Sequence, residues 1–393
     1  MHIERGERDM FDDPIGVDLA RRIYDFGLTE DDLGPRQFGS AAAAKARRPL
    51  GLDWPPGLEP KPTELDEEPD TGDRLPKSDV LVVTWTIAEM LALADVLTPG
   101  VNPRTRWYRY DRFFEDEYLP VIRNGAPARM AGRLGSYYPT KIGTKKVLCV
   151  KSELHLNQDG KTTGAGTATL PVAMFIRQMI EDVSPALVIT VGTAGGTLDN
   201  AKLGDVMVTR AAQFRLSQEF RNEPFATTKY VSPGTIKKKH LTKATELLQA
   251  HADELLEPDF GPPTKFYEWD GPLVDGVENT PRILIEDRDF PKGLPMLTTD
   301  FFEFGTSSNG LGGVGCGVEM GDAVFGMVAD ELGDSAPKWL VIRNASDPQI
   351  NGDLPAGPGG RNMQAHWAVW YYETYGYWTS VNSAIATWAM IAP

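Results

Sequence analysis

The stretch SPALVITVGTAGGTLDNAKLGDVMVT, residues 184–209, decides the fold. Its apolar run at 186–191 is rich in β-branched residues and predicts a buried strand, which ends in the Gly-rich turn VGTAGG. GDVMVT predicts a further strand. Upstream, PVAMFIRQMIEDV (171–183) has the apolar spacing of a helix, and KVLCVKS (146–152) predicts an earlier strand. Strand, helix and strand in this order form the βαβ unit of a largely parallel sheet.

The same alternation extends in both directions along the chain. VLVVTW (80–85) and IAEMLALADVL (87–97) predict a strand that leads into a helix, and GVEM, GDAVFGMVADELG and KWLVIRN repeat strand, helix and strand over 317–344. The aromatic segment 363–391 predicts a buried or interface helix, because polar residues interrupt it too often for a membrane span. Residues 17–26 predict one more helix. We therefore expect an α/β fold.

Composition divides the chain into three parts. Residues 1–56 are expected to be an N-terminal extension with a short helix. Residues 57–78 combine Pro with many carboxylates and almost no large apolar side chains, which predicts an acidic linker that cannot fold alone. Residues 79–393 are expected to form one domain, with insertions at about 100–145 and 255–295.

The charge balance restricts the class of partner. The 393 residues carry a formal net charge of −15, which argues against nucleic acid or an anionic membrane as the main partner, since either demands a basic surface. Cys149 and Cys316 are the two cysteines, and MHIERGERDMFDD lacks the apolar core of a secretory signal. We therefore expect a cytoplasmic protein.

Familiar cofactor and metal motifs are missing from the sequence. GLGGVG contains Gly310, Gly312 and Gly315 at dinucleotide-binding spacing, but it precedes a predicted strand instead of joining a strand to a helix. The sequence has no phosphate-binding P-loop, no HExxH, no GxSxG and no Cys/His set at zinc spacing. We expect no cofactor and no metal.

Polar residues instead gather where predicted strands end. Glu89 follows VLVVTWTIA, Thr193 lies in VGTAGG, Glu319 and Met320 lie in VEMGD, and Asp347 closes VIRNASD. Each has an ordinary alternative: Glu89 as a solvated helix residue, VGTAGG as a tight turn, and Asp347 as a cap. Ligands of open α/β sheets bind at the carboxyl ends of the strands, so together these residues predict one site at one sheet edge.

The order and spacing of VLVVTWTIAEM, the 184–209 stretch, TTDFF, VEMGDAVFGMVADELG and KWLVIRNASD resemble the nucleoside phosphorylase superfamily. They are most similar to its hydrolytic branch, typified by methylthioadenosine/S-adenosylhomocysteine nucleosidase, and the resemblance covers about 79–391. It implies a phosphorylase/hydrolase-like three-layer fold with a mixed, partly barrel-like sheet flanked by helices. The implied activity is hydrolysis of an N-glycosidic bond that releases a free purine base.

The resemblance also implies roles for individual residues. Asp347 falls on the general acid that assists departure of the base at N7, Ser346 orients it, and Glu89 activates the attacking water; a raised pKa of the acid suits this task. Implied substrate-binding positions are Thr193 near the water and ribose, Phe302 stacked on the base, Met320 under the ribose, and Ala194, Gly195, Glu319, Asp322 and Arg343.

Two positions depart from the family pattern. Phosphorylases of the superfamily carry an Arg before the turn, whereas this chain has Thr190 and Val191, which favours water over phosphate as nucleophile. The family usually reads VEME, whose second Glu binds the ribose hydroxyls, and here Gly321 is followed by Asp322. Either Glu319 or Asp322 takes over that task, the sugar is modified, or catalysis is lost.

The insertions suggest where substrate specificity arises. TRWYRYDRFF (105–114) alternates Arg with aromatic residues, so Arg106 and Arg109 are candidate contacts for a 5′-phosphate, with an ordinary protein interface as the alternative. KFYEWDGPLVDG (265–276) is a candidate lid or subunit contact. The expected partner is therefore a small-molecule purine nucleoside or nucleotide.

Three functions remain open from the sequence. The first is the nucleosidase, the second is a phosphate-dependent phosphorylase, and the third is a non-catalytic nucleoside or nucleotide sensor. The resemblance implies a homo-oligomer, for which the aromatic segment 363–391 supplies a buried surface.

Overall fold

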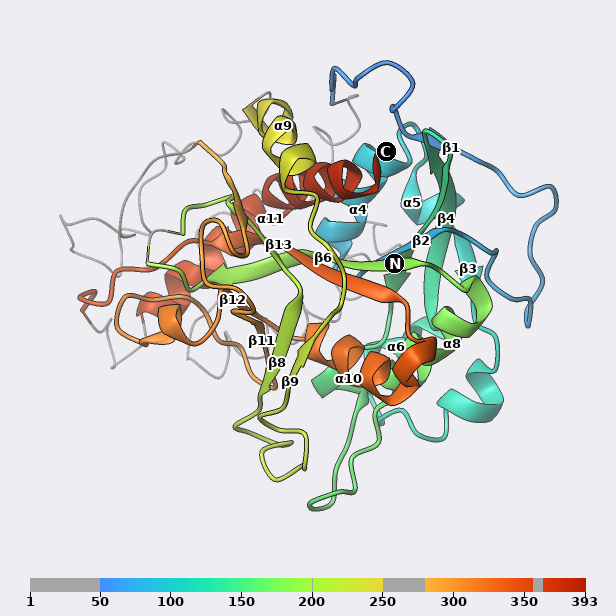
Figure 1. Ribbon diagram of the computed structural model, residues 1–393. Helices are drawn as coiled ribbons and strands as arrows, with labels where there is room; N and C mark the ends of the chain where they lie inside the picture. The colour runs from blue at the N-terminus through green and yellow to red at the C-terminus, as the bar shows by residue number, and fades with distance from the viewer. Residues whose placement is uncertain (1–49, 200, 250–279, 356–362) are drawn as a thin grey trace, which may run out of the picture.

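The computed structural model describes residues 50–199, 201–249, 280–355 and 363–393 (Figure 1). The helix predicted at 17–26 and the segment 265–276 lie outside these ranges.

Four parallel strands form the centre of the sheet. In spatial order they are β5 (Lys145–Ser152), β2 (Val80–Thr84), β6 (Leu187–Gly196) and β13 (Lys338–Asp347). Nearly every side chain of β2, β6 and β13 is buried, because helices cover both faces of the sheet. The strands predicted from the β-branched runs are therefore confirmed.

Four further pairings close part of the sheet into a ring. β6 pairs through its last residues with β12 (Gly317–Glu319), β12 pairs with β11 (Met296–Thr299), and β11 pairs with β8 (Ala211–Arg215). β7 (Val206–Thr209) leads almost directly into β8 and pairs with β13, which returns to β6. This circuit confirms the expected mixed, partly barrel-like sheet.

Shorter strands extend the 13-stranded sheet at its edges. β4 (Gly135–Ile142) pairs with β5 and carries β1 (Lys61–Pro62) and β3 (Tyr108–Tyr110) on its far side. β9 (Lys229–Val231) pairs with β8, and β10 (Ile283–Ile285) pairs with β7.

Helices make the outer layers. Figure 1 shows α4, α9 and α11 on one side of the central strands and α8 and α10 on the other. The bounds are α4 Ile87–Leu97, α5 Pro103–Arg106, α6 Pro127–Ala131, α7 Leu156–Asp159, α8 Pro171–Val183, α9 Lys238–Gln249, α10 Asp322–Leu332 and α11 Met363–Ile391, with short helical turns η2 Phe114–Tyr118, η4 Leu311–Gly313 and η5 Gly333–Ser335. GLGGVG leads through η4 into strand β12 and opens no long helix.

The aromatic helix α11 is buried within the chain. Trp367, Tyr371 and Tyr375 pack in one apolar cluster with Phe302 and Phe304. Polar residues of α11 form hydrogen bonds inside the molecule; for example, the Ser383 hydroxyl donates to the Asn344 side chain at 2.7 Å. Among the helices of the described ranges, none is both long enough and apolar enough to cross a membrane.

The segment expected to be a linker lies against the domain. β1 pairs with β4, Leu75 is only 2% exposed, and Nε1 of Trp388 donates to the carbonyl of Leu58 at 2.7 Å. Just upstream, the ring of Trp54 lies 4.6 Å from that of Trp388. A few widely spaced apolar residues are enough here, because they pack on a surface that the rest of the domain supplies.

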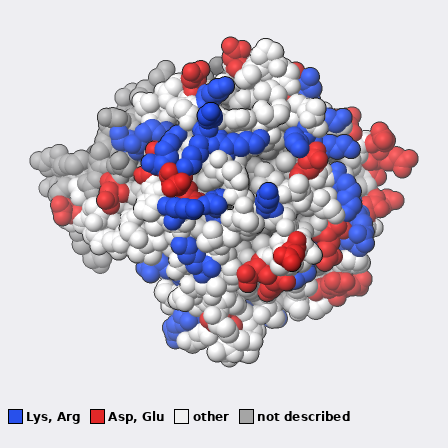
Figure 2. Space-filling model, in the orientation of Figure 1, with Lys and Arg blue, Asp and Glu red and all other residues white. Residues whose placement is uncertain are grey.

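The negative net charge is unevenly distributed. Figure 2 shows Lys and Arg gathered over α9 and the neighbouring strands on this face. Several of these cations are paired: Lys238 lies 3.2 Å from Asp287, and Arg288 lies 2.7 Å from Asp289. The local excess of positive charge is therefore smaller than the colouring alone indicates.

Candidate active site

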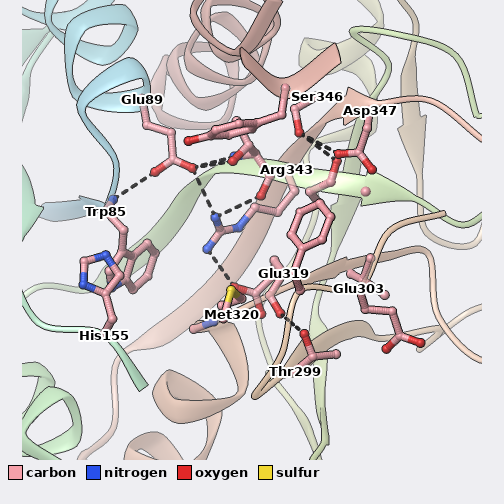
Figure 3. A pocket seen from close by; sticks show the side chains of 17 residues that line it. Trp85, Glu89, His155, Thr299, Glu303, Glu319, Met320, Arg343, Ser346 and Asp347 are labelled. Carbon is pink, nitrogen blue, oxygen red and sulfur yellow. Dashed lines mark hydrogen bonds and ion pairs between the residues drawn. The ribbon is translucent and has the colours of Figure 1, made fainter. Parts of the chain in front are cut away.

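A pocket lies where the carboxyl ends of β2, β6 and β13 meet, facing β11 and β12 (Figure 3). Ten of the residues predicted from the sequence line it: Glu89, Thr193, Ala194, Gly195, Phe302, Glu319, Met320, Arg343, Ser346 and Asp347. The sheet topology brings these residues together from four distant parts of the chain.

Glu89 is fixed at the start of α4. The helix begins after Thr86 with a capping box, in which Glu89 N–H donates to the Thr86 hydroxyl at 3.2 Å and Oε2 of Glu89 accepts from Thr86 N–H at 2.9 Å. The same oxygen accepts from the Thr84 hydroxyl at 2.8 Å and from Trp85 N–H at 3.0 Å. Glu89 is thus held by the chain around it, and it is not a solvated helix residue.

The other oxygen of Glu89 reaches across to β6. Oε1 accepts from the N–H and the hydroxyl of Thr193 at 2.7 and 2.9 Å. A Cβ at Gly192 would lie 2.2 Å from Oε1, so only glycine admits the carboxylate there. Burial favours a higher pKa for Glu89, but Arg343 and the backbone N–H donors outweigh burial and lower it. Glu89 is therefore a carboxylate at neutral pH.

Asp347 has the opposite environment at the end of β13. The Ser346 hydroxyl donates to its Oδ1 at 3.0 Å, while Oδ2 is buried and has no hydrogen-bond partner in the described ranges. A Cβ at Gly195 would lie 2.8 Å from Oδ2, so this glycine lets the carboxyl lie against β6. Burial raises the pKa of Asp347 to about 7. The side chain can hold a proton near neutrality and aim it at a ligand.

Arg343 lies between carboxylates on the floor of the pocket. Its Nε and Nη2 donate to Asp322 at 2.9 and 2.6 Å, and Nη2 lies 3.3 Å from Glu319. Burial alone would lower the pKa of Arg343, but the negative charges of Asp322 and Glu319 stabilise its positive charge and raise the pKa. Asp322 itself does not line the pocket in the described structure, so its task is to hold Arg343.

Glu319 occupies the side of the pocket where the sugar is expected. Its oxygens accept from the Thr298 hydroxyl and from the N–H groups of Gly321 and Asp322 at 2.5 and 2.9 Å. Burial and the nearby Asp322 raise the pKa of Glu319. A Cβ at Gly321 would lie 3.4 Å from the ring of Trp85, so this ring borders the position where the resemblance implies a second Glu.

The two candidate phosphate contacts lie away from the pocket. Arg106 and Arg109 are exposed; the first pairs with Glu64, and the second pairs with Asp111 at 2.7 Å and donates to the Gly132 carbonyl. Strands β4 and β5 separate β3, which carries Arg109, from β2. Within one chain, neither guanidinium reaches the pocket.

The carboxylates of the pocket do not form a metal site. No group of three or more His, Cys, Asp or Glu residues in the described ranges is placed to hold a metal ion. The oxygens of Glu89 and Glu319 accept hydrogen bonds from their own chain, and Glu303 pairs with Arg215 at 2.9 Å.

Sequence reasoning missed six lining residues, Trp85, His155, Thr299, Glu303, Val318 and Tyr372, whereas Gly321, which also lines the pocket, was noted as a departure from the family pattern. Trp85 and His155 follow the ends of β2 and β5 closely, so the strand-end signal that identified Glu89 could have found them. Tyr372 comes from the middle of α11, and no local pattern indicates that it reaches this pocket.

Comparison with sequence families gives a match to part of the chain. The family described as "Phosphorylase superfamily" matches residues 108–278, which confirms the resemblance to the nucleoside phosphorylase superfamily. A search of curated proteins finds no match.

Several solved structures are similar to this chain. A 5′-methylthioadenosine nucleosidase of Arabidopsis thaliana is 15% identical, with 81% of this chain and 96% of that chain covered and a TM-score of 0.43. The futalosine hydrolase of Helicobacter pylori is 11% identical over 79% and 96%, with a TM-score of 0.41. The 5′-methylthioadenosine/S-adenosylhomocysteine nucleosidase of Neisseria meningitidis is 14% identical over 79% and 97%, with a TM-score of 0.40. At such identities, the chemistry of the pocket has to follow from the residues of this chain.

Proposed function

We propose that this chain, a member of the phosphorylase superfamily, is a purine nucleosidase that hydrolyses an N-glycosidic bond and releases the free base. One observation carries the proposal: a buried Asp347 with an unpartnered oxygen and a pKa of about 7 shares a pocket with an ionised Glu89. Two carboxyl groups whose environments drive their pKa values apart are the usual mark of an acid and a base.

The reaction follows from these two groups. As the bond between the sugar carbon and the base nitrogen breaks, both electrons leave with the base, and Asp347 supplies the proton that neutralises it. Water then adds to the oxocarbenium-like sugar and gives its proton to Glu89. One water is consumed, and one free base and one free sugar are formed.

The hydrogen bonds of Glu89 suit a role late in the reaction. Because Arg343 and the hydrogen-bond donors lower the basicity of Glu89, it is a poor base toward water early in the reaction. Its negative charge stabilises the sugar cation, and it accepts the proton once the cation has made the bound water acidic.

The charge of the pocket favours water over phosphate. Arg343 is the one Lys or Arg among the described lining residues, and Asp322, Glu319 and Glu89 lie within 4 Å of it. An incoming phosphate would meet this carboxylate excess without a free cation to bind it. A positively charged transition state gains from the same excess.

The remaining residues give the substrate its orientation in this proposal. Phe302 is placed to stack on the base, Met320 to pack under the sugar, and Glu319 to accept from sugar hydroxyls, since Asp322 is occupied by Arg343.

The homo-oligomer stays a prediction, which sedimentation of the full chain would check.

The test is release of free base from adenosine, inosine and guanosine, followed by chromatography with and without inorganic phosphate. We expect release that does not depend on phosphate, and a loss of about 100-fold or more in kcat in Asp347→Asn. Asp334→Asn, at an exposed position in η5, is the matched control and should keep full activity. Release that requires phosphate, or that persists in Asp347→Asn, contradicts the proposal.

A further inference from the structure

One end of the pocket holds polar atoms that the proposed chemistry does not use. Figure 3 shows Asp347 and Ser346 at one end, and Trp85 and His155 at the other, beyond Glu89. Nε1 of Trp85 and both ring nitrogens of His155 are buried and have no hydrogen-bond partner in the described structure. Nδ1 of His155 lies 3.9 Å from Asp159, which is too far for a hydrogen bond.

Three such atoms on two residues that line the same pocket call for a reason. Proteins leave few buried polar atoms unpaired, because each one that folding removes from water without a partner is destabilising. Trp85 and His155 both line the pocket, so a bound ligand can supply the missing partners. The positions are well supported, since Arg343 lies 5.0 Å above the Trp85 ring and a Cβ at Gly321 would lie 3.4 Å from it.

The hydrogen-bonding capacity of this end fits a hydroxyl group. Burial and the nearby Lys151 lower the pKa of His155 to about 4, so its ring is neutral at pH 7 and has one donor and one acceptor. The indole N–H of Trp85 is a donor only. A hydroxyl can accept from Trp85 and exchange a second hydrogen bond with a ring nitrogen of His155.

A phosphate group does not fit the same place. It only accepts hydrogen bonds at neutral pH, and it needs a free cation to balance its charge. Lys151, whose charge acts on His155, and Arg133 both pair with Glu153, the latter at 2.7 Å. Glu89 adds a negative charge between this end and Asp347.

We propose that Trp85 and His155 bind the 5′-hydroxyl of the substrate, so that the protein acts on unphosphorylated nucleosides and rejects both nucleotides and 5′-deoxy-5′-thioether nucleosides. The inference rests on the proposed function for its orientation, with the base at Asp347 and the far end of the sugar at His155. It answers the question of nucleoside or nucleotide that the sequence leaves open.

Binding to the full chain tests this independently of turnover. Dissociation constants are measured by titration calorimetry for adenosine, 5′-deoxyadenosine, 5′-methylthioadenosine and adenosine 5′-monophosphate, on Asp347→Asn protein if base release is fast. We expect adenosine to bind about 10- to 100-fold more tightly than each of the other three. Equal or tighter binding of any of them, or no binding of adenosine, overturns the inference.

Variants assign the preference to the two side chains. His155→Leu and Trp85→Phe should each bring the ratio of the 5′-deoxyadenosine and adenosine dissociation constants close to one, whereas His155→Gln, which keeps a donor and an acceptor, should retain part of the preference. Trp107→Phe is the matched control: it loses a buried indole N–H that donates to Thr98 at 3.3 Å, and it should leave the ratio unchanged. An unchanged ratio in both His155→Leu and Trp85→Phe contradicts the assignment. Tight adenosine binding without base release counts against the proposed function alone.

Discussion

At the scale of single residues, the pocket places the carboxyl groups of Glu89 and Asp347 in opposite environments. Glu89 accepts five hydrogen bonds and stays charged, whereas Asp347 accepts one from Ser346 and has a pKa of about 7. Both are buried, so the nearby Arg343 and the number of donors, and not burial, separate their pKa values.

The raised pKa of Asp347 makes a prediction about stability. The folded state holds this proton more tightly than the unfolded chain, so stability falls as pH rises from about 4 to about 7 and stays lowered above that. A shift from 3.8 to about 7 corresponds to about 4 kcal/mol at most. The melting temperature of Asp347→Asn, relative to wild type, should therefore increase between pH 5 and pH 8.

Calorimetric melting at several pH values measures this difference directly. Asp334→Asn again serves as control and should follow wild type at every pH, because its side chain is exposed. A difference between Asp347→Asn and wild type that does not change with pH would contradict the raised pKa.

At the scale of elements, β6 is the strand that organises the pocket. It pairs with β2, β12 and β13, and its residue Thr193 supplies two of the five donors that hold Glu89. Gly192 and Gly195 let the two carboxyl groups approach its backbone. VGTAGG, predicted as a Gly-rich turn, therefore continues strand β6 to Gly196, and its glycines serve the site.

Gly192→Ala should disable the pocket. The new Cβ would lie 2.2 Å from Oε1 of Glu89, so either the carboxylate or β6 must move. We expect a loss of about 100-fold or more in base release, as for other displacements of catalytic groups by about 1 Å. The initial rate with the best substrate is the measurement.

Gly313→Ala is the control for that experiment, since a Cβ there meets nothing within 4 Å. Full activity in Gly192→Ala would show that the function of Glu89 does not depend on its close contact with the backbone at Gly192.

The elements were the most predictable part of the structure. Runs such as VLVVT and LVITV are buried on both faces, and local composition alone identifies them as strands. The ring of strands was implied only by the resemblance, because its closure depends on pairings between distant residues. Arg106 and Arg109 looked suited to phosphate, but no local pattern shows that two strands separate them from the pocket.

The candidate site was predictable only in part for the same reason. The strand-end pattern identified Glu89, Thr193, Glu319, Met320 and Asp347, and the resemblance implied the other five predicted residues that line the pocket. Tyr372 could not be found, because the packing of α11 brings it there. The electrostatic roles also required the structure: Asp322, expected at the substrate, instead binds Arg343.

At the scale of the whole molecule, residues 50–78 form part of the folded domain. Leu75 is buried, and its N–H donates to the buried carboxylate of Asp182 at 3.2 Å. Asp182 also accepts from Tyr110 and Arg112 at 2.6 and 2.7 Å, so the segment is joined to both the insertion and α8. Its acidic composition alone did not indicate this attachment.

Leu75→Ala should therefore destabilise the whole domain. Loss of a buried Leu side chain costs about 2–4 kcal/mol, which urea denaturation of the full chain would measure. Met130→Ala, at a side chain 65% exposed, should change the free energy of unfolding by less than about 0.5 kcal/mol. Equal effects of the two substitutions would show that residues 50–78 are attached only loosely.

The capping box of α4 bears on which of the two carboxyl groups would be lost first in a copy of this protein that had become inactive. Glu89 stabilises the first turn of its helix, so selection for a folded chain alone retains it. Asp347 is destabilising above neutral pH, so the same selection removes it. A copy that had stopped working would therefore keep Glu89 and lose Asp347 first. This chain carries both carboxyl groups, including the one that its stability above neutral pH would do better without.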